Sequence, residues 1–308
     1  TIVKHLLLIG KHHMLNRFKQ NIIDIFGHPG KEWLAKLPTV TAEFTEKFQL
    51  IDLQPVTNLS FNYVASGFQN KKPIILKLGP NDKALSKETK CLNAFAQHGG
   101  VEVIASEPGM MLMQRATPGT ALKTYFPNQD DQAITILCQC ISHLHQAEIP
   151  KQHDFYHLNT LLAILDNDLD IPAHIVSKAR QLRDNLLSST EKTVLLHGDL
   201  HHENILQHDN RWLVIDPKGF IGDPVFEVCA FMHNPEPELL NQDNPIEIID
   251  DRTRFCADLL GYSTTRVYDW LYVKSVLCWA WRLDDNLSAD YFKRFVSLLD
   301  KRDSSDEK

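Results

Sequence analysis

The sequence has few cysteines for its length, no long apolar run and no excess of basic residues. Its 308 residues include six cysteines, which form no CxxC pair and fall inside apolar or helical patterns. We expect reduced core thiols in a cytoplasmic protein, because disulfide frameworks belong mainly to small secreted chains. Cys138 and Cys140 look like a metal hook, but residues two apart on a helix point about 200° away from each other.

Transmembrane segments and a positive charge balance are also missing. No stretch reaches the roughly 18 apolar residues of a membrane-spanning helix, and Leu6–Ile9 is too short for the core of a signal peptide. The 32 lysines and arginines are outnumbered by 39 acidic residues, which gives a net charge of −7. This balance argues against nucleic acid or an anionic membrane as a partner. The sequence does not indicate an oligomeric state.

Three segments of different character divide the chain. Residues 1–50 have helical spacing with a break at 26–30, residues 51–115 read as strands around one helix, and residues 116–308 carry long helical patterns. A turn at 117–120 is the natural linker. We expect an α+β fold with a small mixed β lobe, an N-terminal helical segment packed on it, and a larger helical lobe. Small-molecule sites often lie where two such lobes meet.

The densest chemical signal is a polar loop between two short apolar strands, Val194–Leu196 and Trp212–Ile215. The loop contains Asp199 and Asn204, and the second strand is followed by Asp216. Phosphoryl transfer uses one acid to orient a hydroxyl, and an amide and a second acid to hold Mg²⁺. Asp199 alone fits a turn or a helix cap equally well, but the joint spacing favours catalysis. We expect His197 to brace the loop.

A helix start follows the second strand. Asp223 precedes Pro224, which is the arrangement of a helix N-cap and first helical residue. Glu227 would then lie in the first turn, where the helix dipole favours an acid. Both acids are therefore expected to be structural.

The second chemical signal is a lysine inside the strand pattern of residues 73–79. Lys77 is flanked by apolar residues, and burying its ammonium without a partner would be costly. The following helical pattern places Glu88 on an otherwise apolar face, so the two side chains can satisfy each other. In a kinase-like site this pair would direct the lysine to nucleotide phosphates. The alternative is a surface lysine and a solvated glutamate.

These features together resemble the protein-kinase-like two-lobe fold of the aminoglycoside phosphotransferases. Residues 197–206 (HGDLHHENIL) and 212–227 (WLVIDPKGFIGDPVFE) are similar to the group that contains streptomycin 6-phosphotransferases and hydroxyurea phosphotransferases. Residues 30–38 (GKEWLAKLP) and 111–119 (MLMQRATPG) are also similar to this group. The resemblance runs from Phe26 to Asp285 and implies a small-molecule kinase of the antibiotic-resistance type.

The resemblance also implies roles for individual residues. Asp199 is expected to be the catalytic base, with Asn204 and Asp216 as the Mg²⁺ ligands. Lys77 would bind the phosphates of ATP or GTP, and Glu88 would hold Lys77 in place. The partners implied are a nucleoside triphosphate and a small hydroxylated acceptor.

Two further parts of the pattern concern the purine and the loop over the phosphates. Main-chain groups of Gln114, Arg115 and Ala116 are expected to hold the purine. The loop over the phosphates should be rich in glycine, yet Thr57–Tyr63 contains none. This departure leaves the nucleotide affinity, and the choice between ATP and GTP, open.

The acceptor is expected to bind on the helical lobe. The later part of this lobe carries six acids that could meet a polycationic acceptor: Glu236, Glu238, Asp250, Asp251, Asp284 and Asp285. Asp284 and Asp285 lie at a position similar to the family's acceptor pocket, whereas each acid alone also fits a solvated helix face. An aminoglycoside-like (streptomycin-like) or hydroxyurea-like acceptor is implied, and a housekeeping amino-alcohol or sugar is the alternative.

Two other function classes compete with a kinase. His197, Asp199, His201 and His202 resemble a zinc hydrolase cluster, but Leu195 stands where another histidine would be needed. A non-catalytic, kinase-like nucleotide-binding protein is favoured by the missing glycines. It is disfavoured because every side chain needed for Mg²⁺ and proton handling is present.

Overall fold

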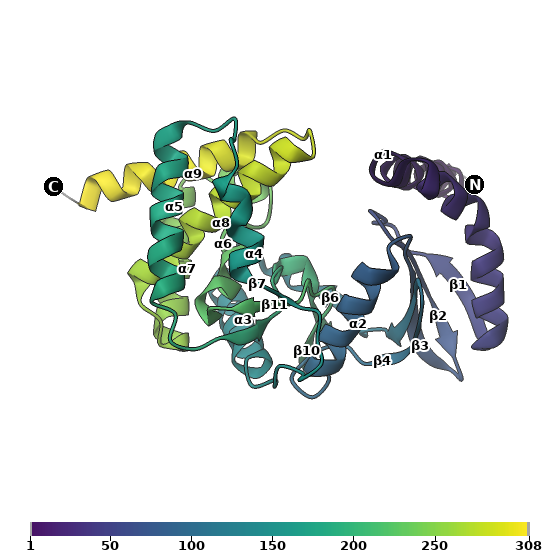
Figure 1. Cartoon of the computed structure of the whole chain (residues 1–308). Coiled ribbons are helices and arrows are strands. Elements are labelled where there is room, and N and C mark those ends of the chain that lie inside the picture. Colours follow the sequence, from purple (N-terminus) through teal and green to yellow (C-terminus); the bar gives the residue numbers. More distant parts are fainter. Residues whose placement is uncertain (1, 307–308) are drawn as a thin grey trace. The chain divides into compact units, whose positions relative to one another are not determined.

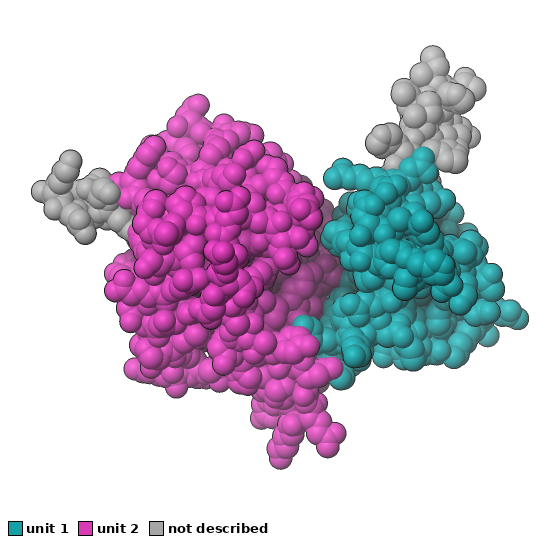
Figure 2. All heavy atoms as spheres, turned by 45° about the horizontal axis from the view of Figure 1, so that its top comes forward, with its two compact units in different colours: residues 1–96, 101–117 teal, residues 97–100, 118–308 magenta. Residues whose placement is uncertain are grey.

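The computed structural model describes the backbone of residues 2–306 and the side chains of residues 15–302. The chain forms two compact units (Figure 1). Figure 2 colours the first, residues 1–96 and 101–117, teal and the second, residues 97–100 and 118–308, magenta. The short segment 97–100 belongs to the second unit, where the Val214 amide donates a 2.8 Å hydrogen bond to the Gly99 carbonyl.

A five-stranded antiparallel sheet forms the centre of the first unit. The strands lie in the order β1-β2-β3-β5-β4. Their bounds are β1 Leu50–Pro55, β2 Tyr63–Gln69, β3 Lys72–Leu78, β4 Val103–Glu107 and β5 Met110–Gln114. The strands expected within residues 51–115 are confirmed, and the pattern at 73–79 corresponds to β3. A register shift interrupts the pairing of each edge strand, β1 and β4.

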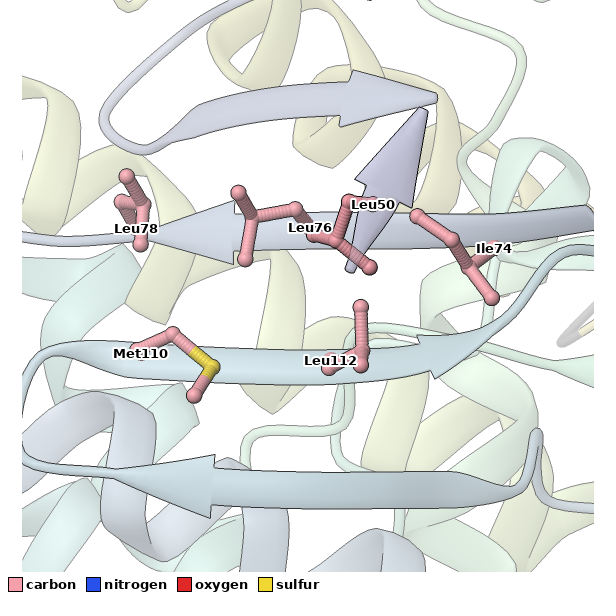
Figure 3. Packing of buried hydrophobic residues seen from close by; sticks show 6 residues of the cluster. All are labelled: Leu50, Ile74, Leu76, Leu78, Met110 and Leu112. Carbon is pink, nitrogen blue, oxygen red and sulfur yellow. The ribbon is translucent and has the colours of Figure 1, made fainter. Parts of the chain in front are cut away.

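Helix α1 (Ile2–Lys47) covers one face of this sheet. The helical spacing of Trp33, Leu37 and Phe44 is confirmed, since these side chains pack on the buried cluster of the sheet. Figure 3 shows that cluster, which consists of Leu50, Ile74, Leu76, Leu78, Met110 and Leu112. The predicted break at 26–30 is a kink at Gly27, where φ is 58° and ψ is −131°. A glycine is also required at Gly30, because a Cβ there would lie 2.6 Å from the backbone oxygen of Ile22.

Helix α2 (Asp82–Phe95) follows β3 and begins with a side-chain cap. The Ala84 amide donates to Asn81 Oδ1 at 3.1 Å. The buried face of α2 includes Leu85, Glu88 and Leu92, as the helical spacing predicts. A carboxylate therefore lies among apolar side chains directly after the strand that carries Lys77.

The second unit is mainly helical. Its α-helices are α3 Asp130–Leu144, α4 Leu158–Leu162, α5 Ala173–Ser188, α6 Cys229–Met232, α7 Pro245–Leu260, α8 Thr264–Asp284 and α9 Asp290–Asp306. Short 3₁₀ turns occur at Leu122–Tyr125, Ala163–Asp166, His202–Asn204, Pro224–Val228 and Glu238–Asn241. The long helices pack on one another, and α8 contacts both α5 and α9. Trp270 of α8 is completely buried in this core.

Two small sheets complete the second unit. One has the order β10-β9-β6 and the other β7-β11-β8. The strands are β6 Pro118–Ala121, β7 Tyr156–His157, β8 Val194–Leu196, β9 Ile205–His208, β10 Arg211–Val214 and β11 Phe220–Gly222. The turn predicted at 117–120 is therefore wrong in part, because Pro118–Ala121 pairs with β9 as a strand. Gly119 has a φ of 78° and the pairing is irregular, which explains why the segment reads as a turn.

The cysteines and the helices agree with two expectations from the sequence. All six cysteines are free and buried, as predicted. Within the part of the chain that the structure describes, no helix combines the length and the hydrophobicity needed to cross a bilayer.

Candidate active site

Two antiparallel strand pairs bring the backbone of the predicted catalytic residues together. Because β8 pairs with β11, the loop that leaves β8 lies beside the segment that enters β11. The β9–β10 hairpin places Asn204 next to Ile215, whose amide donates to the Asn204 carbonyl at 3.0 Å. The loop that carries Asp199 and the segment that carries Asp216 therefore lie side by side.

The carboxylates of Asp199 and Asp216 lie beside one ammonium group, that of Lys218. Lys218 Nζ lies 3.7 Å from Asp199 Oδ2 and 3.5 Å from Asp216 Oδ2. Asn204 Nδ2 donates to the Asp199 carbonyl at 2.9 Å, which leaves the amide oxygen of Asn204 able to bind a cation. The two carboxylates thus lie beside the same ammonium, and the Asn204 side chain is tied to the backbone of Asp199. Carboxylate and amide oxygens are ligands suited to Mg²⁺.

The Asp199 carboxyl lies in a cationic environment. Burial favours its neutral form, but His201, Lys218, Lys274 and His197 outweigh this effect and lower its pKa below the usual value. Asp199 is therefore ionised at neutral pH and able to accept a hydrogen bond from an alcohol. The local charge contrasts with the net charge of −7 for the whole chain.

Of the two lysines near Asp199, Lys274 is the more deeply buried. Its side chain, on helix α8, is 4% exposed. The ammonium lies 5.1 Å from the ring centroid of Phe226 and 4.8 Å from that of Trp281. Aromatic faces attract a cation at these distances, so the two rings stabilise an ammonium beneath the catalytic loop.

His197 braces the catalytic loop, as the sequence predicts. Its buried ring places Nε2 2.8 Å from the Ile215 carbonyl, and its own carbonyl accepts hydrogen bonds from Lys218 and Gly219 amides at 2.7 and 3.3 Å. Burial is the main cause that lowers the His197 pKa, so the imidazole is neutral. The neutral ring donates from Nε2 and accepts the Asp199 amide at Nδ1, 3.3 Å away.

Glu227 has a role that its position in the sequence did not indicate. Its buried carboxylate accepts hydrogen bonds from the amides of His197 at 2.6 Å and Gly198 at 2.9 Å. Burial opposes its ionisation, but hydrogen bonding and charge attraction from His145, followed by weaker contributions that include the Gly198 amide, hold the pKa of Glu227 below its usual value. The prediction of a dipole-stabilised first-turn acid therefore missed the main function of this side chain, which is to fix the backbone before Asp199.

Asp223 caps a helical turn, as predicted, and also binds two side chains of helix α8. Its Oδ1 accepts from the Val225 amide at 2.9 Å. Its Oδ2 accepts from Trp270 Nε1 at 2.8 Å and from Arg266 Nε at 2.9 Å. This buried hub ties α8 to the turn that carries Glu227.

The histidines of the proposed zinc cluster have structural partners instead. The His202 ring stacks on Phe231 with centroids 3.8 Å apart, and burial with nearby Arg252 lowers its pKa strongly. His201 Nδ1 accepts from the Glu203 amide at 3.3 Å. Among the residues that the structure describes, no group of three or more His, Cys, Asp or Glu side chains is arranged to hold a metal ion.

In the first unit, Lys77 and Glu88 form a buried ion pair. Lys77 Nζ donates to the two carboxylate oxygens of Glu88 at 2.8 and 2.7 Å, and the side chains are only 7% and 10% exposed. The pair predicted from the spacing of β3 and α2 is therefore confirmed. Two lysines close to Glu88 in the sequence of α2 are less buried than Lys77: Lys87 is half-buried and Lys90 is exposed.

The glycine-free loop 56–62 is anchored by helix α1. Leu59 is 8% exposed and packs with Phe18 and Ile22 of the helix. Asn21 Nδ2 also donates to the Ser60 carbonyl at 3.3 Å. These contacts with helix α1 hold the position of a loop that contains no glycine. The feature of the sequence that could have indicated this anchoring is Leu59, an apolar residue between the polar residues Asn58 and Ser60.

The expected purine-binding segment lies at the end of β5. The Gln114 amide donates to the Glu102 carbonyl at 2.9 Å, and the Arg115 amide donates to the Pro73 carbonyl at 3.1 Å. Both donors are therefore used within the sheet. Ala116 follows them and is buried.

Comparisons with known proteins agree with this arrangement. The model of the aminoglycoside/hydroxyurea antibiotic resistance kinase family matches residues 53–286. The chain belongs to this family. A streptomycin 3''-kinase of Klebsiella pneumoniae is 29% identical over 70% of this chain and 82% of its own length. A streptomycin 6-kinase of Streptomyces glaucescens is 23% identical over 86% and 89%, respectively.

A solved structure shows the fold. A thermostable mutant of aminoglycoside phosphotransferase APH(4)-Ia, in a ternary complex with ADP and hygromycin B, matches with a TM-score of 0.63 and 17% identity. The match covers 84% of this chain and 96% of the other. The α+β, protein-kinase-like fold is thereby confirmed. As a member of the antibiotic resistance kinase family, the chain is a small-molecule phosphotransferase that acts on an alcohol group.

Most acids considered for the kinase acceptor are already neutralised within the protein. Glu236 pairs with Arg282, Glu238 with Lys123, Asp250 with Arg302, and Asp251 with Arg254. Asp284 and Asp285 are exposed at the end of α8, and none of the ion pairs found among the described residues involves them. They are therefore the two acids of this set that could meet a cationic ligand without breaking an internal pair.

Proposed function

We propose that this enzyme transfers the γ-phosphoryl group of ATP or GTP to a hydroxyl of a streptomycin-like or hydroxyurea-like acceptor in the cytoplasm. The observation that carries the proposal is that the carboxylates of Asp199 and Asp216 both lie beside Lys218 Nζ, while the Asn204 side chain is hydrogen-bonded to the backbone of Asp199. The names of the similar kinases support the class of acceptor.

Asp199 is assigned as the base in this reaction. Its carboxylate accepts a hydrogen bond from the acceptor hydroxyl, orients the oxygen and receives the proton as the new O–P bond forms. The lowered pKa of Asp199 keeps it ionised for this task. Glu227 and His197 hold the backbone on either side of Gly198, so the carboxylate is positioned before substrate binds.

The amide oxygen of Asn204 and the carboxylate of Asp216 are assigned as Mg²⁺ ligands. Both donors are oxygen atoms, which suits this hard cation. When bound, Mg²⁺ neutralises charge on the β- and γ-phosphates. Lys77, held by Glu88, is assigned to the nucleotide phosphates.

The purine and the acceptor are assigned to the remaining candidates. Because the amides of Gln114 and Arg115 donate within the sheet, the amide of Ala116 is the donor best placed to meet the base. Asp284 and Asp285 are assigned to basic groups of the acceptor, because no internal cation pairs with them among the described residues.

A panel of acceptors tests the proposal. Streptomycin, hydroxyurea, amino-alcohols and sugars are incubated with Mg²⁺ and ATP or GTP, and phosphorylated products are detected by mass spectrometry. We expect streptomycin or hydroxyurea to gain a phosphoryl group. We expect Asp199→Ala to reduce turnover by about 10² to 10⁴-fold while nucleotide affinity changes little. Phosphorylation of an amino-alcohol or sugar alone would replace the assigned acceptor class.

Slow hydrolysis of the nucleotide tests whether the site is catalytic at all. Without an acceptor, water can take the place of the hydroxyl beside Asp199. We expect radiolabelled ATP to be hydrolysed more slowly by Asp199→Asn than by the wild type. Equal rates, together with no product from the acceptor panel, would favour a binding protein without catalytic activity.

A further inference from the structure

Lys218 is a charged residue at the centre of the site whose role in phosphoryl transfer is not yet assigned. Its Nζ lies 3.5 Å from Asp216 Oδ2, which is assigned to Mg²⁺, and 3.7 Å from Asp199 Oδ2, which is assigned as the base. The side chain is 47% exposed, so the ammonium can be reached by a ligand. It is therefore the cation that an anion entering between Asp199 and Asp216 would meet.

The backbone of Lys218 is fixed to the catalytic loop. Its amide donates to the His197 carbonyl at 2.7 Å, two residues before Asp199. Gly198 has a φ of 82°, and a Cβ there would lie 2.5 Å from the ring of Phe220. The loop and the segment carrying Lys218 thus pack without space for even one methyl group. Lys218 is as firmly positioned at its backbone as Asp199.

The proposed reaction brings two negatively charged groups together beside Lys218. A γ-phosphoryl group that approaches the acceptor hydroxyl also approaches the ionised Asp199, and the two anions repel each other. Lys77 makes a two-oxygen contact with Glu88, which offsets its charge. An additional cation beside Asp199 would lower the cost of bringing phosphate and carboxylate together.

We propose that Lys218 contacts the transferring phosphoryl group and stabilises its charge in the transition state. This inference rests on the proposed function. The acceptor oxygen forms a bond to the γ-phosphorus while the bond from phosphorus to the bridging oxygen of the diphosphate breaks. The hydroxyl proton passes to Asp199. Lys218 stays protonated throughout and donates an N–H to a γ-phosphate oxygen.

The alternative is that Lys218 only balances the two carboxylates. The two roles differ in what they do to a ligand that mimics the transition state. A balancing cation would affect the ground-state nucleotide and the mimic alike, whereas a phosphoryl contact favours the mimic.

Calorimetry with two ligands separates these roles. The affinities of AMP-PNP and of ADP with aluminium fluoride, both with Mg²⁺, are measured for wild type, Lys218→Met and Lys218→Arg. Lys293→Met is the control, because Lys293 is 49% exposed and also lies 3.7 Å from a carboxylate, that of Asp290. Circular dichroism and thermal melting establish that each variant is folded.

We expect Lys218→Met to bind AMP-PNP within about threefold of wild type and to lose about 10² to 10³-fold in affinity for ADP–aluminium fluoride. Turnover should fall by a similar factor, Lys218→Arg should recover part of both losses, and Lys293→Met should match the wild type. Equal changes for the two ligands, or no change, would overturn the inference while leaving the proposed function intact. Failure of the wild type to bind either ligand would instead overturn the proposed function, and this inference with it.

Discussion

The buried ion pair between Lys77 and Glu88 allows stability and nucleotide binding to be tested separately. Three variants are needed: Lys77→Met, Glu88→Leu and the double variant. Each single change leaves one charge buried without its 2.7–2.8 Å partner. The double change replaces both charged groups by apolar side chains of similar size, so no charge remains to be solvated.

The expected magnitudes follow from the burial of the pair. With side chains only 7% and 10% exposed, the loss of one partner should lower the free energy of unfolding by about 3–5 kcal/mol. The double variant should lie within about 1 kcal/mol of the wild type, or be more stable. Nucleotide binding should behave differently. Loss of a charged hydrogen bond costs about 1.5–3 kcal/mol, so the variants without Lys77 should bind Mg-ATP about 10 to 100-fold more weakly.

Urea unfolding followed by circular dichroism measures the first effect, and calorimetry with AMP-PNP measures the second. Lys72→Met is the matched control, because Lys72 is exposed on the same strand. We expect the double variant to be stable but weak in nucleotide binding. A stable Lys77→Met variant would refute the buried-charge reasoning. A double variant with wild-type affinity for AMP-PNP would refute the assignment of Lys77 to the phosphates.

Three further predictions concern residues that hold the site. Glu227→Gln should lower stability by about 1.5–3 kcal/mol at pH 7 in urea unfolding, because one loop amide loses its charged acceptor. Since the folded-state pKa of Glu227 lies below the ordinary value of a glutamate, this difference should persist at neutral pH and shrink as acidification protonates the carboxylate of the folded protein. A difference independent of pH would contradict the assignment. Leu59→Ser should raise the KM for nucleotide about tenfold with little change for acceptor, whereas the exposed Phe61→Ser should change neither; unaltered kinetics in Leu59→Ser would rule out anchoring by α1. Asp223→Asn should lower the melting temperature strongly, by the equivalent of about 3–5 kcal/mol, and the exposed Asp184→Asn should not; similar melting of both would refute the hub.

The sequence predicted those parts of the site that depend on local pattern. Lys77 and Glu88 could be paired because strand alternation and helical spacing each place one charge on a buried face. Asp199 and Asp216 could be grouped because each lies shortly after the end of a short strand, β8 and β10 respectively. These inferences need only periodicity and the cost of burying charge.

The parts that were missed depend on contacts between distant residues. Glu227 lies 29 and 30 residues from the amides it accepts, and nothing in its own segment indicates those partners. Leu59 packs on Phe18 across about 40 positions of sequence, and only the fold brings them together. The strand Pro118–Ala121 reads as a turn because its pairing with β9 is irregular.

The assignment of Asp199 as the base and Asp216 as a Mg²⁺ ligand can be tested directly. The measurement is the affinity of AMP-PNP with and without Mg²⁺ for wild type, Asp199→Asn and Asp216→Asn. Asparagine suits position 216, where the backbone φ is 64°, because it tolerates this conformation and removes only the charge. We predict that Mg²⁺ strengthens binding in the wild type and in Asp199→Asn, and that Asp216→Asn loses most of this effect. Undiminished strengthening in Asp216→Asn, or equal loss in both variants, would contradict the assignment of a metal ligand and a base.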